Sequence, residues 1–275
     1  QGPKCGVVVE DGVVDLAAAG CVFTDMMDII NGGAEALEAV AQTVADTKPQ
    51  HALNSVSLLA PISRPGKYLA IGMNYKKHVD EAHKLGVAVP EYQVWFNKQT
   101  TCVSGPYDEI DPGVTEKLDY EAELGLIIGT AAKGVSKEDA LKHVFGYFVA
   151  NDVTARDWQM HTSTFTMGKS FDTHGPIGPW IITADEVPDP QNLELRCYVN
   201  DELRQSINTS EMVHCIANQI NYLSTAFTLE PGDLIATGTP SGVGVAMEPP
   251  VFLQAGDVVR CEVDGIGVIE NRVRD

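Results

Sequence analysis

From residue 67 onward, this 275-residue chain is a succession of short apolar segments separated by turns rich in glycine and proline, a pattern typical of β-strands. The apolar segments lie at residues 68–71, 93–96, 120–128, 143–153, 181–182, 193–199, 234–236 and 258–263. Helical patterns interrupt them at residues 75–84, 137–142 and roughly 210–223. Strands and helices do not alternate regularly, which argues against a doubly wound α/β sheet. We predict an α+β fold dominated by a mixed β-roll or β-sandwich.

The first 65 residues have the pattern of a small α/β module. Two short β-branched segments precede residues 25–46, in which apolar side chains recur at helical spacing. Prolines 61 and 65 then mark a boundary. We therefore predict an N-terminal module over residues 1–65 and a catalytic domain over residues 66–275. The length also fits two modest domains.

The acidity of the chain limits its partners. The formal net charge is -19 at pH 7, and the isoelectric point is near 4.6. Such a surface repels phosphate backbones, so we expect no nucleic-acid partner. It also repels small anions, so a site for an anionic substrate needs local positive charge from a metal, lysine or arginine. The chain has no run of about 18 apolar residues, so we predict no membrane-spanning segment.

The six cysteines are spaced neither as zinc ligands nor as a CxxC pair. In a chain of this length they are typical of buried thiols in a reducing compartment. We recognise no charged N-terminal region followed by a long apolar run, as a secretory signal would have. We expect a cytoplasmic protein, or a protein of the mitochondrial matrix if a targeting segment has been removed.

Candidate metal ligands lie between Leu118 and Ile128, a segment with the pattern of a strand because apolar β-formers follow its charges directly. Side chains two residues apart in a strand share a face, so Glu121 and Glu123 point the same way. Two such carboxylates repel each other unless a cation or protons lie between them. Hard oxygen ligands of this kind suit Mg²⁺, Mn²⁺ or Ca²⁺.

Asp152 is the third candidate ligand. It follows the apolar segment 145–151, at the end of a predicted strand. Glu121 and Glu123 would also fit a solvated strand edge without a metal. Asp152 would also fit a loop cap. Spacing alone leaves both interpretations open.

A series of motifs extends over most of the chain. They are Gly72-Met73-Asn74-Tyr75 with His78 and Glu81, then Asp119 to Leu124, Asn151 to Gln159, Gly168 to Thr173, Gly175 to Trp180, and Thr237 to Gly244. In this order they resemble the fumarylacetoacetate hydrolase family, over roughly residues 66–275. Within the family, the chain is most similar to the small fumarylacetoacetate hydrolase domain-containing proteins. It is also similar to their acylpyruvase and 2,4-diketo-3-deoxy-sugar-acid hydrolase relatives.

The resemblance implies a mixed β-roll, a homodimer, and one Mg²⁺ or Mn²⁺ that chelates a small 2-oxo acid substrate. The metal ligands that it implies are Glu121, Glu123 and Asp152, the set that the smaller members use. A further metal carboxylate of the large fumarylacetoacetases has no clear counterpart in this chain.

The resemblance also implies three catalytic residues. His78 and Glu81 would lie on a mobile lid over residues 75–90 and would activate a water molecule. Three residues apart in a helix, they share a face, and a carboxylate fixes the tautomer in which an imidazole acts as general base. Without the resemblance, an ordinary surface pair is the simpler interpretation. Lys169, flanked by small residues, would stabilise developing oxyanion charge, although a surface lysine would have the same pattern.

Four residues are implied as substrate-binding: Arg156, Gln159, Thr239 and Met73. Arg156 could clamp a carboxylate through two N–H groups, or could simply pair with Asp157. Thr239 lies in a glycine-rich turn and can offer its hydroxyl and its backbone N–H. We expect Asp172 to be structural, orienting Lys169.

The predicted function is metal-dependent hydrolysis of a C–C bond in a 2,4-dioxo acid, such as an acylpyruvate, fumarylpyruvate or a diketo-deoxy-sugar acid, to pyruvate and a second acid. The alternative is an oxaloacetate decarboxylase or oxaloacetate keto–enol tautomerase, which needs the same charge stabilisation but no attacking water. A non-catalytic binding protein is disfavoured because the three carboxylates occur together with His78, Glu81 and Lys169.

Overall fold

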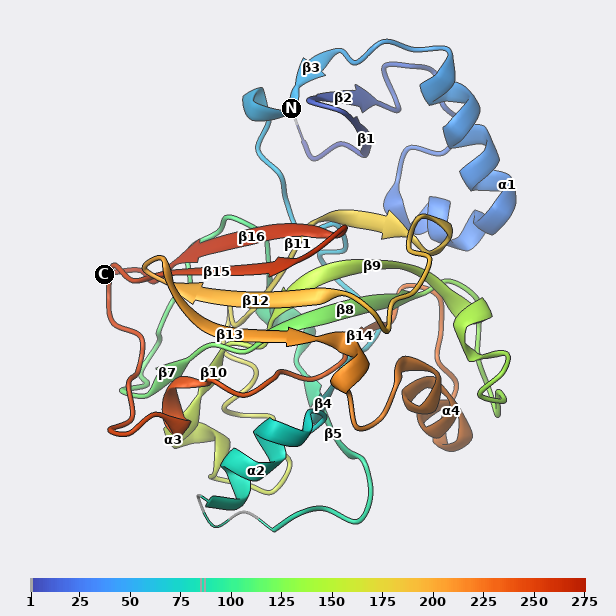
Figure 1. Ribbon diagram of the computed structural model, residues 1–275. Coiled ribbons are helices and arrows are strands. Elements are labelled where there is room, and N and C mark those ends of the chain that lie inside the picture. Colours follow the sequence, from blue (N-terminus) through green and yellow to red (C-terminus); the bar gives the residue numbers. More distant parts are fainter. Residues whose placement is uncertain (1, 85, 87) are drawn as a thin grey trace.

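Two packed β-sheets form the centre of the molecule (Figure 1). The computed structural model describes residues 2–84, 86 and 88–275. The larger sheet has seven strands in the order β5-β4-β14-β8-β9-β11-β6. Their bounds are β4 Tyr68–Gly72, β5 Val94–Lys98, β6 Val103–Ser104, β8 Ala122–Ile128, β9 Val144–Asn151, β11 Gly175–Thr183 and β14 Leu234–Ala236. Both parallel and antiparallel pairs occur in it.

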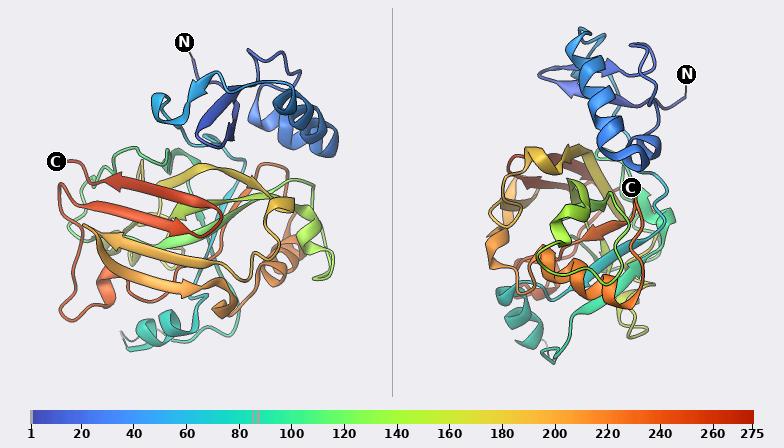
Figure 2. Two further views of the ribbon diagram at one scale, coloured as in Figure 1. Left: turned by 45° about the horizontal axis from the view of Figure 1, so that its top comes forward. Right: turned by 90° about the vertical axis from the view of Figure 1, so that its right-hand side faces the viewer.

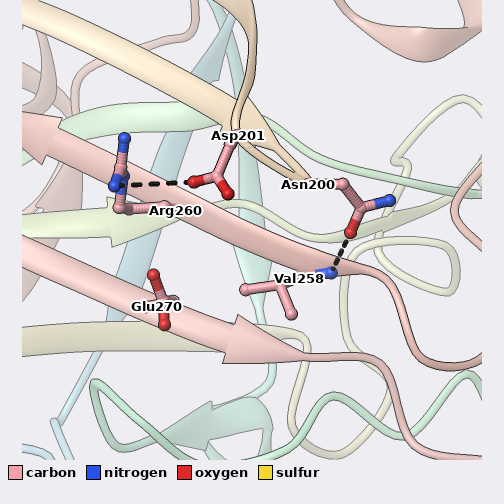
Figure 3. Close-up of a pocket in the computed structure, with 5 residues that line it drawn as sticks. All are labelled: Asn200, Asp201, Val258, Arg260 and Glu270. Atoms are coloured by element: carbon pink, nitrogen blue, oxygen red, sulfur yellow. Dashed lines mark hydrogen bonds and ion pairs between the residues drawn. The ribbon is translucent and has the colours of Figure 1, made fainter.

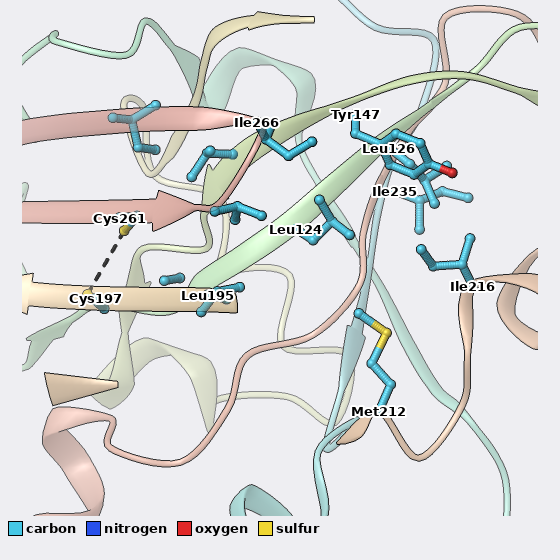
Figure 4. Close-up of a cluster of buried hydrophobic side chains, with 14 of the residues drawn as sticks. Leu124, Leu126, Tyr147, Leu195, Cys197, Met212, Ile216, Ile235, Cys261 and Ile266 are labelled. Carbon is cyan, nitrogen blue, oxygen red and sulfur yellow. Dashed lines mark hydrogen bonds between the residues drawn. The ribbon is translucent and has the colours of Figure 1, made fainter. Parts of the chain in front are cut away.

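A four-stranded antiparallel sheet covers one face of the larger sheet. Its order is β13-β12-β15-β16, with bounds β12 Glu194–Val199, β13 Glu202–Asn208, β15 Val258–Val263 and β16 Gly267–Arg272. Burial alternates along β12 and β15, as expected for strands with one face on the core. Figure 4 shows this core, with Leu124 and Leu126 from the larger sheet and Leu195 and Cys261 from the smaller one.

The N-terminal residues pack on the opposite face of the larger sheet (Figure 2). They form a small sheet of β1 (Gly6–Val9), β2 (Gly12–Asp15) and β3 (His51–Ala52), and the helix α1 (Met26–Ala45). Ile29 and Ile30 of α1 share a buried cluster with Tyr68 and Phe96. Because both of its faces are covered, β8 is buried at every position. The division at residues 65 and 66 stays a prediction.

The α+β fold is confirmed, with two corrections to the predicted helices. The helix expected over residues 75–84 is α2 (Lys76–Lys84). Residues 137–142 form turns and a short 3₁₀ helix, Ala140–His143, instead of an α-helix. The helix expected from residue 210 begins later, as α4 (Ile216–Ala226), because the backbone N–H groups of Val213 and His214 donate to Asn74. None of the described helices is long and apolar enough to cross a membrane.

Candidate active site

The three predicted metal ligands meet at the ends of central strands. Glu123 lies in β8, Asp152 follows β9, and Glu121 lies between β8 and the short strand β7 (Leu118–Asp119), so the strand expected from 118 to 128 is interrupted. All three are buried, and one oxygen from each lies within 4.8 Å of the others. The backbone fixes this arrangement, because the Asp152 N–H donates to the Glu121 carbonyl at 2.8 Å.

Three buried cations surround these carboxylates. Lys169 Nζ lies 2.8 Å from Glu121 and 2.7 Å from Asp152. Lys98 Nζ lies 2.5 Å from the other oxygen of Asp152. Arg156 Nη1 lies 2.7 Å from Glu121, while Arg156 Nε donates to Asp119 at 2.8 Å. The cluster therefore combines four acids with three bases, and its side chains are almost entirely shielded from solvent.

The two glutamates respond to this environment in opposite directions. Burial favours the neutral form of Glu121, but Lys169 and Arg156 outweigh it and lower its pKa to about 2. Burial raises the pKa of Glu123 well above its usual range, and the charges of Asp152 and Glu121 raise it further. Burial lowers the pKa of Lys169, but Asp152 and Glu121 outweigh it and raise that pKa. The raised pKa of Glu123 means that the mutual repulsion of the three carboxylates falls mainly on Glu123.

A divalent cation fits this donor set. The ligands are all carboxylate oxygens, which suits Mg²⁺ or Mn²⁺ better than a soft metal. A cation among them would relieve the repulsion that raises the pKa of Glu123. The residues that would hold it are Glu121, Glu123 and Asp152.

The structure also joins His78 and Glu81. Both lie on α2, with His78 Nδ1 3.3 Å from the Glu81 carboxylate. Glu81 in turn accepts a hydrogen bond from the Gly242 backbone N–H at 3.0 Å, which holds α2 against the glycine-rich turn. His78 is also near enough to Glu121 to contribute to lowering its pKa. Residues 85 and 87 of the predicted lid lie outside the described residues.

The four predicted substrate-binding residues have different surroundings in the structure. Arg156 does not pair with Asp157. It bonds Asp119 and Glu121 and donates to Gln159 at 3.2 Å, while its buried Nη2 has no partner among the described residues. Substrate contact through that nitrogen, and through Gln159, stays a prediction. Gln159 ends the short helix α3 (Arg156–Gln159).

Met73 and Thr239 follow the neighbouring parallel strands β4 and β14. The Thr239 hydroxyl is already engaged, donating to the Ala122 carbonyl at 3.0 Å and accepting from Gln205 at 2.9 Å. The backbone N–H of Thr239 is the group still predicted to contact a substrate. Met73 follows β4 in a left-handed backbone conformation, with φ of 55°, which is uncommon outside glycine. Substrate contact stays a prediction for both residues.

Sequence reasoning missed Lys98 and Asp119, and it was wrong about Asp172. Asp172 is exposed, whereas the Lys169 backbone is held through its carbonyl, which accepts a hydrogen bond from Lys98. Asp119 accepts from Arg156 and from the backbone N–H of Gly244 at 2.8 Å. Lys98 bonds the predicted ligand Asp152, and Asp119 lies two residues before the predicted ligand Glu121. The burial of both residues is visible only in the fold.

A surface hollow lies away from this site. It has a volume of about 330 Å³ and lies on the solvent side of the four-stranded sheet (Figure 3). Its lining residues are Asn200, Asp201, Val258, Arg260 and Glu270. None of the predicted site residues takes part in it.

Comparison with known proteins gives the family. Residues 67–274 match the model described as fumarylacetoacetate (FAA) hydrolase C-terminal. The oxaloacetate tautomerase fahd2, mitochondrial, of Xenopus laevis is 44% identical over 98% of this chain and 86% of its own. The fumarylacetoacetate hydrolase of Exiguobacterium antarcticum is 37% identical, with a TM-score of 0.81 and coverage of 98% and 95%.

A further solved relative is the maleylpyruvate hydrolase of Sphingobium sp. SYK-6, in complex with manganese(II) and pyruvate. It is 33% identical, with a TM-score of 0.83, and the match covers 100% of this chain and 97% of that one. With the buried acidic cluster, these matches agree with the resemblance of the motifs. The chain belongs to the fumarylacetoacetate hydrolase family of enzymes.

Proposed function

We propose that this protein is an oxaloacetate keto–enol tautomerase that depends on Mg²⁺ or Mn²⁺. The observation that carries the proposal is the match, over 98% of the chain, to a relative named as an oxaloacetate tautomerase. The relatives thus favour the alternative derived from the sequence over C–C bond hydrolysis. The site contains what a tautomerase requires, namely a proton-transfer group and a set of cations for a dianionic substrate.

The cations of the site suit oxaloacetate. Oxaloacetate is a dianion near neutral pH, and its enolisation places further negative charge on an oxygen. Lys169 Nζ and the unpartnered Arg156 Nη2 are the donors best placed to bind that charge and a substrate carboxylate. When bound at the three carboxylates, the divalent ion would supply Lewis-acid charge beside the substrate oxygens.

His78 is the group proposed to move the proton. A carboxylate only accepts hydrogen bonds, so the contact with Glu81 places the imidazole hydrogen on Nδ1. Nε2 is then free to take a proton from the substrate carbon and return it to the enol oxygen, or the reverse. Glu81 positions the ring, and its bond to the Gly242 N–H fixes the helix that carries both residues.

We also propose, from the family resemblance, that the protein acts as a homodimer. The relatives named as mitochondrial support the matrix as its location, the second of the two locations expected from the sequence. Size-exclusion chromatography with light scattering tests the dimer.

The test follows the ultraviolet absorbance of enol oxaloacetate during ketonisation. The metal-loaded protein should accelerate ketonisation in proportion to its concentration, and His78→Ala should remove most of that acceleration. Pyruvate formation, measured in parallel, separates tautomerisation from decarboxylation. A metal-loaded wild-type protein that leaves the ketonisation rate unchanged overturns the proposal.

Hydrolysis of an acylpyruvate is the second candidate. The solved maleylpyruvate hydrolase, which matches this chain along its whole length, favours it specifically. In that reaction the free nitrogen of His78 would take a proton from a water instead of from carbon. A panel of acylpyruvates and oxaloacetate, compared by kcat/KM, decides between the two, and we expect oxaloacetate to give the larger value.

A further inference from the structure

Lys98 is a buried lysine to which the proposed function assigns no role. It ends β5, and its side chain is fully shielded from solvent. Its ammonium group donates to Asp152 Oδ1 at 2.5 Å and to the Lys169 carbonyl. The next residue, Gln99, donates through its backbone N–H to the Ser170 hydroxyl at 3.0 Å. The end of β5 therefore holds Asp152, the Lys169 carbonyl and the Ser170 side chain.

The two oxygens of Asp152 have different partners. Oδ1 is bonded to Lys98, whereas Oδ2 lies 2.7 Å from Lys169 Nζ, on the side of the cluster that includes Glu121. Lys98 makes no ion pair with Glu121 or Glu123 among the described residues, so it acts on the cluster through Asp152. Its bond engages Asp152 Oδ1, and Oδ2 is the oxygen that shares Lys169 with Glu121.

The number of oxygens that a carboxylate offers distinguishes small cations from large ones. Mg²⁺ requires near-octahedral coordination by six ligands, to which a carboxylate contributes one oxygen. Ca²⁺ takes six to eight ligands and readily accepts both oxygens of one carboxylate. A residue that holds the second oxygen of a ligand therefore disfavours the larger ion, whereas a residue bonded to the oxygen that would bind the ion affects small and large ions alike.

We infer that Lys98 is a positioning residue that sets the ion preference of the centre, by keeping Asp152 a ligand through one oxygen and so disfavouring Ca²⁺. The inference rests on the proposed metal centre. It adds a role for a residue that contacts neither the substrate nor the ion, and that acts only through Asp152.

The test measures ion binding instead of turnover. Mn²⁺ is bound to the protein and followed by its electron paramagnetic resonance signal, and Mg²⁺ and Ca²⁺ are titrated against it in separate series. The readout is the ratio of the Ca²⁺ to the Mg²⁺ dissociation constant. In Lys98→Met this ratio should fall about tenfold, the lower end of the usual effect of changing a residue that holds a metal ligand.

Lys169→Met is the matched control. It also removes a buried positive charge bonded to Asp152, but it leaves the bond between Lys98 and Oδ1 in place. Any general effect of charge acts on both divalent ions alike, so Lys169→Met should change the two dissociation constants and leave their ratio unchanged. An unchanged ratio in Lys98→Met, or an equal fall in both variants, overturns the inference.

A crystal structure of the wild-type protein with Mn²⁺ tests the same point if Lys98→Met does not fold. Asp152 should bind the ion through one oxygen while the other stays on Lys98. Binding through both oxygens overturns the role of Lys98 and leaves the proposed function intact. A wild-type protein that binds none of the three ions overturns the proposed metal centre, and the role of Lys98 with it.

Discussion

At the scale of single residues, the contact between His78 and Glu81 gives the most direct prediction for turnover. Replacing either with alanine should lower kcat/KM for tautomerisation by roughly 100- to 10,000-fold, the usual contribution of a positioned general base. The double variant should be little worse than either single one, because the pair acts as a unit. The measurement is kcat/KM in the four proteins, with His83→Ala, an exposed histidine of the same helix, as control. Retained activity in His78→Ala would mean that another group moves the proton.

His174 gives a prediction for stability. It is fully buried, bonds the Asp111 carbonyl through Nε2 at 2.9 Å, and has a pKa lowered to about 4 by burial and by the charge of Lys98. The unfolded chain, with a histidine pKa near 6.5, therefore binds more protons between pH 6.5 and 4. Stability should fall as pH decreases through that window, by about 3 kcal/mol at pH 4.

The matched variant for this effect is His174→Gln, which does not titrate and can still donate to the Asp111 carbonyl. Urea unfolding of both proteins at pH 7, 5.5 and 4.5 gives the free energies. The wild type should lose more stability than the variant as the pH is lowered. Parallel losses in the two proteins would assign the acid sensitivity to other groups.

The sequence could predict some residues of this site and not others, for a physical reason. Glu121 and Glu123 were recognisable because a spacing of two places carboxylates on one face of a strand. Lys98 was not, because a lysine at the end of an apolar strand is ordinarily solvated. Its burial depends on Asp152, 54 residues later in the chain, which the pattern around Lys98 does not reveal.

At the scale of elements, the glycine-rich segment 238–245 connects the helix α2 to the buried acids. Its backbone N–H groups donate in turn from Gly238 to Glu123, from Gly242 to Glu81, and from Gly244 to Asp119. One short segment thus touches a candidate metal ligand, the carboxylate of Glu81 on α2, which we predict to be a lid, and the acid that holds Arg156. A displacement of this segment should therefore affect the lid.

Gly242→Ala tests this connection. The φ of Gly242 is 104°, and an added Cβ would lie 2.0 Å from the Arg204 carbonyl oxygen, so the backbone must shift and weaken the bond to Glu81. In the wild type, we expect oxalate with Mg²⁺ to protect residues 75–84 from hydrogen exchange. Gly242→Ala should reduce that protection and lower kcat/KM. Gly134→Ala is the control, since Gly134 also has positive φ but open space around its Cβ position. Equal protection with and without oxalate in the wild type would contradict a lid.

The central strands β8 and β9 of the larger sheet were more predictable than β6 and most of β11 in the same sheet, or than the edge strands of the smaller one. β8 and β9 are buried at every position, and their continuous apolar sequences mark them plainly. β13 and β16 escaped prediction because they are the outer strands of the four-stranded sheet and carry mostly polar or exposed residues. Pairing with β12 and β15 determines that these segments form strands, and their own sequences do not reveal that pairing.

At the scale of the whole molecule, the net charge and the site act in opposite directions. The formal charge of -19 repels a dianionic substrate at long range, while Lys98, Lys169 and Arg156 gather beside the acids of the site. With Glu123 neutral in the metal-free protein, the three other acids balance the three bases. With all four acids ionised around a divalent cation, the cluster would carry a net charge of +1. Attraction of the substrate therefore depends on the metal.

Removal of the metal should consequently affect both turnover and stability. Chelation should abolish activity, and Mg²⁺ or Mn²⁺ should restore it, whereas Zn²⁺ should be a poor substitute at a centre made only of carboxylates. Mn²⁺ at about 100 times its dissociation constant should stabilise the fold by about 2.7 kcal/mol. That corresponds to a rise in Tm of roughly 5 to 10 °C for a chain of this size. Differential scanning calorimetry of the metal-free and loaded protein measures the shift.

Glu123→Gln is the matched control for this last prediction. Its amide oxygen can still accept from the Gly238 N–H, but it removes a carboxylate from the proposed metal centre. Because burial and the neighbouring acids already favour the neutral form of Glu123, the metal-free variant should be about as stable as the metal-free wild type. The variant should lose most of the increase in Tm that Mn²⁺ produces. A wild-type protein that is fully active after chelation, or a variant whose Tm still rises as much with Mn²⁺, would show that these carboxylates do not hold the metal.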